Sequence, residues 1–233
     1  MCIRDRLLEQ LGFIVETVPR RCCGRTMMSK GMIETVKEHA RINVDLFYPY
    51  AQAGIPIVGT EPSCLLTLRD EYPDLLPGDS KASTVANQAF LLDEFLIKLA
   101  DEGDLDLDFQ PHEGKVIFHS HCHLKSAIGI DASVAMLKRV PGVEVETPDT
   151  GCCGMAGAFG FEKEHYDVSL AIGERVLFPA VRNNAGIPIV TTGVSCHQQI
   201  EAGTDVKTVH LAEFLAQQLG NANRCPMSLP TTR

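Results

Sequence analysis

The sequence contains one cysteine-bearing unit twice. Each copy has two adjacent cysteines followed by a glycine, at Cys22-Cys23-Gly24 and at Cys152-Cys153-Gly154. A Ser-Cys pair follows each motif further along the chain, ending at Cys64 in the first copy and at Cys196 in the second. Adjacent cysteines are uncommon, so their recurrence in the same context indicates a repeated structural module whose function depends on its thiols.

The repeat extends beyond the cysteines. The string AGIPIV begins at Ala53 and returns at Ala185, 132 positions later, which is also the spacing of the two Ser-Cys pairs. The second copy has a further cysteine upstream, Cys122, within the run HSHCH. Its counterpart in the first copy would fall before residue 1. We therefore expect the first copy to lack one strand and one cysteine, as in a chain truncated at its N-terminus.

Both ends of the chain carry segments that we exclude from the repeats. Residues 1–6, MCIRDR, resemble translated sequencing-adapter text, and an artefact of this kind has no bearing on the fold. The tail over residues 221–233 contains Cys225 and two prolines, and we expect it to be loose. Neither Cys2 nor Cys225 belongs to the repeat, so we assign no function to them.

The hydrophobic pattern predicts alternating strands and helices. Such an alternation indicates an α/β fold with mostly parallel sheets and right-handed crossovers. We expect two tandem repeats over residues 7–100 and 115–220, each with a small sheet and flanking helices, joined by an acidic linker over residues 101–114. The expected strands are 15–18, 55–59, 115–120, 143–146, 187–191 and 206–210; the expected helices are 30–52, 64–68, 85–99, 132–139, 163–183 with a kink near Pro179, and 211–219; a loop is expected over 72–83.

Cys64, Cys122 and Cys196 each follow a predicted strand, and ligands of parallel sheets collect at the carboxyl ends of strands. Neighbouring side chains point apart in an extended chain, so both cysteines of a CCG motif can face one site only in a tight loop, which glycine permits. Glycines surrounding the second motif would also let backbone N–H groups reach sulfur. We therefore expect nonlocal thiolate sites. The candidate residues are Cys122, Cys152, Cys153 and Cys196 in the second copy and Cys22, Cys23 and Cys64 in the first.

Three kinds of chemistry remain open for these thiols. An iron–sulfur centre is one. Zinc is another, because His121, His123 and His197 flank cysteines and Cys₃His is a common structural set, although the usual CxxC knuckle of zinc sites is absent. A vicinal disulfide or a reactive thiol pair is the third. His119, His121 and His123 alternate, which predicts one shared face on a strand.

Composition narrows the class of protein. The chain has 233 residues, a formal net charge of -9 and no cluster of Lys and Arg, which disfavours nucleic acid as a partner. No apolar run approaches the roughly 20 residues of a membrane span. Nine cysteines without a signal peptide are typical of a reducing compartment. We expect a cytoplasmic protein that reaches the inner membrane, if at all, through its partners.

Longer strings carry a resemblance to a known family. They are CCGR at residues 22–25, EPSCLLTLRDEYP at 61–73, GCCGMAG at 151–157 and EKEHY at 162–166. With the order Cys, CCG and distal Cys, they resemble the cysteine-rich CCG domain family, which includes the CCG-bearing subunit of heterodisulfide reductase and iron–sulfur subunits that oxidise glycolate, lactate or glycerol 3-phosphate. They are also similar to the C-terminal region of fused proteins with an FAD-linked oxidase domain and a ferredoxin-like domain.

The resemblance implies an iron–sulfur electron-transfer module of an FAD-dependent D-2-hydroxy-acid dehydrogenase, of the lactate, glycolate or 2-hydroxyglutarate type. The implied cofactors are a 4Fe-4S cluster, non-cubane in some members, and FAD on a separate part. The implied partners are flavin and ferredoxin-like domains and a downstream quinone or protein acceptor. This segment would not oxidise substrate alone. A zinc-stabilised interaction domain and a thiol-disulfide reductase site of the heterodisulfide reductase type are the alternatives.

The resemblance carries the ligand pattern onto the seven cysteines named above. One departure is visible, because family members with the full motif end in CxxC. Here Glu61 and Gly193 occupy the first position of that motif. A five-thiolate site is therefore not expected, and Glu61 could offer a carboxylate.

Overall fold

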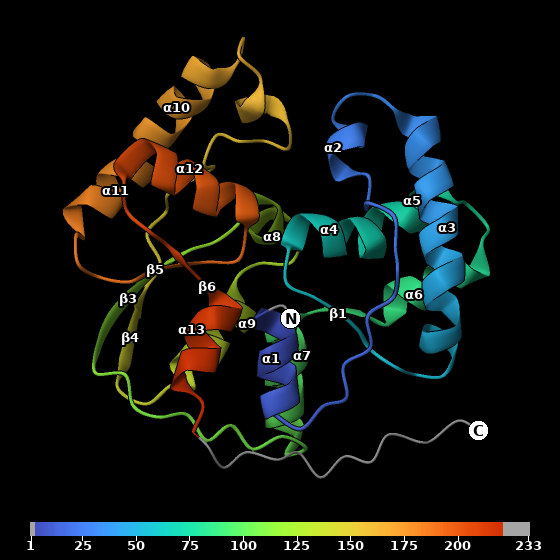
Figure 1. Ribbon diagram of the computed structural model, residues 1–233, viewed down its shortest axis with the longest axis horizontal. Coiled ribbons are helices and arrows are strands. Elements are labelled where there is room, and N and C mark those ends of the chain that lie inside the picture. The colour runs from blue at the N-terminus through green and yellow to red at the C-terminus, as the bar shows by residue number, and fades with distance from the viewer. Residues whose placement is uncertain (1–2, 221–233) are drawn as a thin grey trace.

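The computed structural model describes residues 3–220 and contains two small parallel sheets flanked by helices (Figure 1). The larger sheet has the strand order β4-β3-β5-β6, and the smaller pairs β1 with β2. All four strand pairings are parallel. The α/β prediction is thus confirmed. The strands are β1 Ile57–Gly59, β2 Ala89–Leu91, β3 Gly114–His119, β4 Val143–Glu146, β5 Ile189–Thr191 and β6 Val209–His210.

Helices surround both sheets. In the first repeat they are α1 Ile3–Gln10, α2 Arg25–Met28, α3 Ile33–Gln52, α4 Pro62–Leu66, the π-helical turn η1 Thr67–Glu71, α5 Tyr72–Leu75, α6 Ser80–Asn87 and α7 Leu92–Glu102. In the second repeat they are α8 Cys122–Ala127, α9 Asp131–Lys138, the 3-10 turn η2 Phe159–Phe161, α10 Tyr166–Glu174, α11 Leu177–Asn183, α12 Val194–Thr204 and α13 Leu211–Gln218. None of the helices within residues 3–220 is both long enough and apolar enough to cross a bilayer.

The central strand β3 is buried on both faces over residues 116–119, as is usual for the inner strand of a parallel sheet. Val116 and Phe118 point into one core cluster, whereas Ile117 points into another. Because consecutive side chains of a strand alternate between faces, this split places a helical layer on each side of the sheet. The strand therefore holds its carboxyl end, where the cysteine loops begin, in a fixed position.

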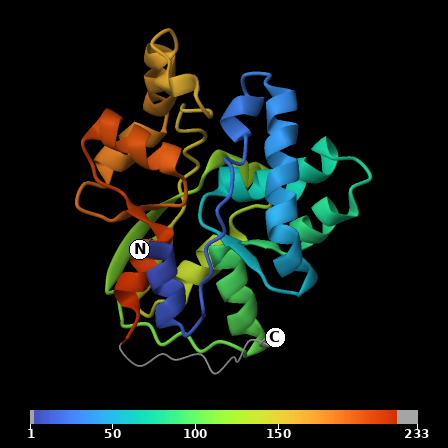
Figure 2. The same ribbon diagram turned by 45° about the vertical axis from the view of Figure 1, so that its right-hand side comes forward.

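The two repeats share their largest core cluster. Leu7 of α1 lies in it together with Leu215 of α13, and Leu96 of α7 lies in it with Leu137 of α9. Figures 1 and 2 show α1 beside α13 in both views. The first helix of one repeat thus packs with the last helix of the other. This packing of α1 against α13 joins the two repeats.

Several element predictions were wrong. Residues 15–18 form no strand, because no neighbouring strand within the described residues pairs with them. The predicted helix over 163–183 is two helices that separate at Arg175 and Val176, and Pro179 lies in the first turn of α11, where proline is tolerated. The predicted loop 72–83 contains α5 and the start of α6, and the predicted helix 85–99 is divided by β2.

Candidate metal centre

Three loops of the second repeat bring four cysteines together. Cys122 begins α8, two residues beyond the end of β3, and Cys196 lies in the first turn of α12 after β5. Cys152 and Cys153 lie in the loop that follows β4. The Cys152 and Cys122 Sγ atoms are 3.9 Å apart, and Cys153 contacts both Cys152 and Cys196. The four thiols thus form one continuous row.

The pKa values of neighbouring thiols in this row are shifted in opposite directions. The hydrogen bond from Cys122 lowers the pKa of Cys152 far below its usual value, and the same contact raises the pKa of Cys122. Contact with Cys153 likewise lowers the pKa of Cys196, and Cys152 and Cys196 together raise the pKa of Cys153. The geometry therefore favours two thiolates, Cys152 and Cys196, each beside a thiol that donates to it. Thiolates are the form of cysteine that binds metals.

Glycine at the third position of the second CCG motif is required by packing. Gly154 has φ +100°, and a Cβ there would lie 2.2 Å from the backbone oxygen of Ser169. The Ser169 hydroxyl donates to the Gly154 carbonyl at 2.9 Å, and Gln199 Nε2 donates to Ser169 at 2.9 Å. The Gly154 N–H donates to the Cys152 sulfur at 3.3 Å. The tight loop thus directs a backbone donor at a thiolate, as predicted.

Two histidines lie beside the second row. His119 contacts the Thr150 hydroxyl through Nδ1 at 2.6 Å, while its Nε2 is buried without a partner of hydrogen-bond geometry. The ring lies close enough to Cys196 to contribute to the lowered pKa of that thiol. His121 is the N-cap of α8 rather than a strand residue, and His123 lies inside α8. The predicted strand face of three histidines is therefore wrong, because β3 ends at His119.

The first repeat brings together a smaller set. Cys22 and Cys23 precede α2, and Cys64 lies in α4 after β1. A hydrogen bond from Cys64 lowers the pKa of Cys23 to about 6 and raises that of Cys64. Cys22 and Cys64 are exposed, whereas Cys153 and Cys196 of the second set are buried. The first site is thus more open and has one cysteine fewer.

Two buried residues that sequence analysis missed hold the first CCG loop in place. The Tyr72 hydroxyl donates to the Cys23 carbonyl at 3.0 Å and accepts from Asn43 Nδ2 at 2.9 Å. Asn43 Oδ1 accepts from the Arg21 N–H at 2.8 Å. Asn43 occupies an apolar position in the helical pattern of α3, and such a polar interruption was the available signal. Ser169 and Gln199, which hold the second loop, gave no comparable signal.

Glu61 serves as a helix cap that joins the two repeats. Its Oε1 accepts from the N–H and the hydroxyl of Ser63, and its Oε2 accepts from the Val194 N–H at 2.8 Å. Both oxygens are thus occupied, which disfavours the suggested role of Glu61 as a ligand. At the equivalent position of the second repeat, a Cβ on Gly193 would lie 2.4 Å from the His121 ring. His121 therefore fills the space that a side chain at residue 193 would need.

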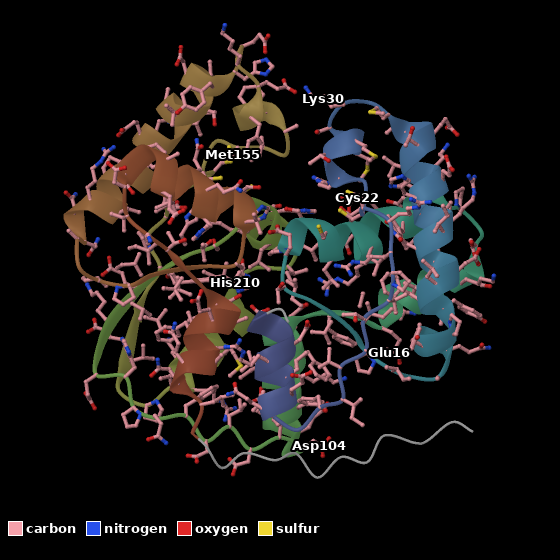
Figure 3. All side chains as sticks on the ribbon, viewed as in Figure 1. Glu16, Cys22, Lys30, Asp104, Met155 and His210 are labelled. Atoms are coloured by element: carbon pink, nitrogen blue, oxygen red, sulfur yellow. The ribbon has the colours of Figure 1, made fainter. Side chains whose placement is uncertain are left out.

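Further polar contacts connect the sites. The His123 N–H donates to His121 Nδ1, which leaves the proton on Nε2, and Nε2 donates to the Ser63 hydroxyl at 3.1 Å. Within the first repeat, an ion pair joins Arg25 to Glu71. Lys30 of the first repeat forms an ion pair with Glu162 of the second. Figure 3 shows Lys30 and Met155, which precedes Glu162 in the chain, on facing parts of the two repeats. The two cysteine sites thus share one interface.

The predicted site residues have different outcomes. The structure brings the four cysteines of the second repeat into contact, and also Cys22, Cys23 and Cys64 of the first. Cys2 and Cys225 lie outside the described residues. Within residues 3–220, no group of three or more Cys, His, Asp or Glu side chains is arranged so that it could hold a metal ion directly. The thiols form rows, so metal binding would require new side-chain rotamers.

Comparisons with known proteins identify the family. The family model of the cysteine-rich domain, CCG, matches residues 3–69 and 116–201, which include all seven cysteines of the two sites. The chain belongs to this CCG cysteine-rich domain family. The two matched segments also follow the two repeats.

Curated relatives include dehydrogenases and their subunits. The chain is 32% identical over 216 residues to one subunit of the anaerobic glycerol-3-phosphate dehydrogenase of Escherichia coli K12, covering 92% of this chain and 54% of the relative. It is 30% identical over 210 residues to the D-2-hydroxyglutarate dehydrogenase of the same strain, covering 87% and 19%. It is 27% identical over 222 residues to lactate utilization protein A of Oceanobacillus iheyensis, covering 90% and 86%. The chain spans about half the length of the first of these relatives.

Proposed function

We propose that this chain is the iron–sulfur electron-transfer module of a flavin-dependent dehydrogenase. The observation that carries the proposal is the row of four cysteines contributed by three loops at the carboxyl ends of β3, β4 and β5. Cysteine thiolates are the usual ligands of iron–sulfur clusters, and four of them are the usual number. When bound, such a cluster accepts and passes on single electrons.

The residues of the second repeat suit a soft metal centre. Cys122, Cys152, Cys153 and Cys196 would hold it, and two of them already favour the thiolate. The backbone N–H of Gly154 donates to sulfur, and hydrogen bonds of this kind tune the reduction potential of a cluster. Buried Cys153 and Cys196 keep water from one side of the site. The donor atoms suit such a centre, and the four cysteine side chains would have to change rotamer to surround it.

The substrate class follows from the relatives. Glycerol 3-phosphate and D-2-hydroxyglutarate, named in two of them, both carry a secondary alcohol. We propose that the whole enzyme oxidises such a group, as in a D-2-hydroxy acid, on a flavin held by another domain or subunit. Electrons would then pass through this module to a quinone or protein acceptor. The chain alone is expected to leave the substrate unchanged.

Zinc is the second candidate for the same residues. The observation that favours it is the 3.9 Å separation of the Cys122 and Cys152 sulfurs. Two thiolates on one tetrahedral zinc at about 2.3 Å lie about 3.8 Å apart, close to that value. His119, with its buried Nε2 beside Cys196, would be the nitrogen donor of such a site.

Anaerobic purification with an absorption spectrum and metal analysis separates the two. The proposal expects a brown protein with broad absorption near about 400 nm, bleached by dithionite, and iron with acid-labile sulfide. Colourless protein with one zinc per chain would support a zinc-stabilised interaction domain instead. Protein that binds neither metal after anaerobic reconstitution would reject both.

A further inference from the structure

Helices α4 and α12 correspond in the two repeats, but only α4 has a side-chain cap from its own N-cap residue. Glu61 precedes α4, and its Oε1 accepts from the Ser63 N–H at 3.2 Å. The corresponding N-cap of α12, 132 positions later, is Gly193, which makes no side-chain hydrogen bond. A Cβ at residue 193 would lie 2.4 Å from the His121 ring, so no larger residue fits there. Helix α12 therefore takes an acceptor from another part of the chain.

Glu61 supplies that acceptor from the first repeat. Its Oε2 accepts at 2.8 Å from the N–H of Val194, the first residue of α12, so the N-terminal ends of α4 and α12 adjoin (Figure 1). The residue of α4 that corresponds to Val194 is Pro62, and proline has no N–H to donate. The dipole of α12, a helix of 11 residues, also favours a carboxylate at this end. One carboxylate thus caps both helices.

The first turn of α12 carries a buried cysteine of the second site. Cys196 lies two residues after Val194, is 1% exposed and packs in the same core cluster as Cys153. The first N–H groups of a helix have no partner within it, and a helix end frays when they lack an outside acceptor. The hydrogen bond to Glu61 therefore stabilises the turn that places the Cys196 thiol.

We propose that Glu61 is a positioning residue of the second cysteine site, although it belongs to the first repeat. Its carboxylate holds the Val194 N–H and so keeps the first turn of α12, with Cys196, in place beside Cys153. Glu61 acts through the backbone of α12 and is not itself a ligand. The effect on a bound centre rests on the proposed function, whereas the placement of Cys196 can be measured without metal.

Alkylation of the reduced chain measures the placement of Cys196. A buried thiol reacts with iodoacetamide only when its surroundings open, so the rate at Cys196, followed by mass spectrometry of peptides, reports opening of the first turn of α12. Glu61→Ala should raise this rate about tenfold, because loss of a helix cap shifts the opening equilibrium by about that factor.

Val194→Pro removes the other half of the same hydrogen bond. Proline is favoured at the first helical position, and Gly193 already has the extended backbone that a residue before proline needs. We expect the alkylation rate of Cys196 to rise in this variant too, since the proline ring replaces the N–H and displaces the carboxylate. Combined with Val194→Pro, Glu61→Ala should add less than about twofold, because the hydrogen bond is already lost.

Asp79 offers a matched control. It caps α6 in the first repeat, where its side chain accepts from the Lys81 N–H at 2.9 Å, and α6 contains no cysteine. Asp79→Ala removes a cap of the same kind, and it should leave the alkylation rate of Cys196 within about twofold of wild type. A residue that only stabilises the fold as a whole would act on Cys196 no more than Asp79 does.

The reconstituted chain gives a second readout. Glu61→Ala should release iron to a chelator about tenfold faster than wild type, whereas Asp79→Ala should release it at the wild-type rate. If the wild-type chain binds no iron, the proposed function fails, and the alkylation of Cys196 still decides the role of Glu61.

Two results would overturn the positioning role. One is an alkylation rate of Cys196 in Glu61→Ala that stays within about twofold of wild type, and the other is an equal rise in Glu61→Ala and Asp79→Ala. If Glu61→Ala fails to fold, Glu61→Gln takes its place. It keeps one acceptor oxygen for two donors, so its alkylation rate should lie above that of wild type.

Discussion

Each CCG glycine takes a left-handed backbone conformation against a packed neighbour. Gly24 has φ +92°, with a Val36 methyl 2.7 Å from where its Cβ would lie, and Gly154 has φ +100° against the Ser169 carbonyl. The two contacts differ in kind, because a side chain can move and a backbone carbonyl held by hydrogen bonds cannot. Glycine in the motif therefore serves both backbone conformation and close packing.

Gly154→Ala should be far more damaging than a glycine substitution without the clash. Gly186 has φ +87° and nothing within 4 Å of its Cβ position, so Gly186→Ala should cost only about 1–2 kcal/mol of unfolding free energy. Gly154→Ala should cost about 2 kcal/mol more, because overpacking adds to the strain. Urea unfolding of both variants measures the difference. Equal losses would contradict the packing argument.

Burial makes Asp93 a source of pH-dependent instability. This residue of α7 accepts a hydrogen bond from Ser133 of α9, lies beside Glu94, and has a pKa raised above 3.8 mainly by burial. Because its folded pKa exceeds its unfolded value, stability is lost as pH rises from about 3.8 through the folded pKa. Asp93→Asn should therefore stabilise the protein at pH 7 by about 1–3 kcal/mol.

Thermal unfolding at several pH values tests this sign. The gain from Asp93→Asn should shrink toward pH 4 and be nearly absent below it. A variant that is less stable than wild type at pH 7 would show that the Ser133 contact outweighs the cost of burying the charge.

At the scale of elements, the sequence predicts well those strands and helices that the local hydrophobic pattern determines. The apolar runs of β1, β3 and β5 locate those strands, and the spacing in residues 30–52 locates α3. Cys64, Cys122 and Cys196 were placed correctly because each follows such a strand. Other elements depend on tertiary contacts. Residues 15–18 have strand character without a partner, β2 is a three-residue strand fixed by pairing with β1, and His121 leaves the strand because it caps α8.

Helix α1 should contribute to the stability of both repeats. Leu7 is fully buried in the shared core, so Leu7→Ala should cost about 2–5 kcal/mol of unfolding free energy. Val168→Ala on exposed α10 should change it by less than about 0.5 kcal/mol. Denaturant unfolding followed by circular dichroism measures both. Similar small effects would mean that α1 is not part of the cooperative fold.

At the scale of the whole molecule, the two repeats form one unit around two unequal cysteine sites. Helix α1 of the first packs against α13 of the second, and Glu61 and His121 form hydrogen bonds with the opposite repeat. The second site has four cysteines, two of them buried, whereas the first has three that are more exposed. A site that lacks one of four ligands should bind an iron–sulfur centre much more weakly. We therefore expect one centre per chain.

Iron and zinc analysis with native mass spectrometry of the anaerobically reconstituted chain tests this claim most directly. Wild type should carry one iron–sulfur centre. Cys153→Ser should lose it, because a hydroxyl is a poor substitute for a thiolate on a soft metal. Cys64→Ser should keep it, as should Cys2→Ser and Cys225→Ser. Two equally occupied centres in wild type, or full iron retention in Cys153→Ser, would contradict the assignment of the centre to the second repeat.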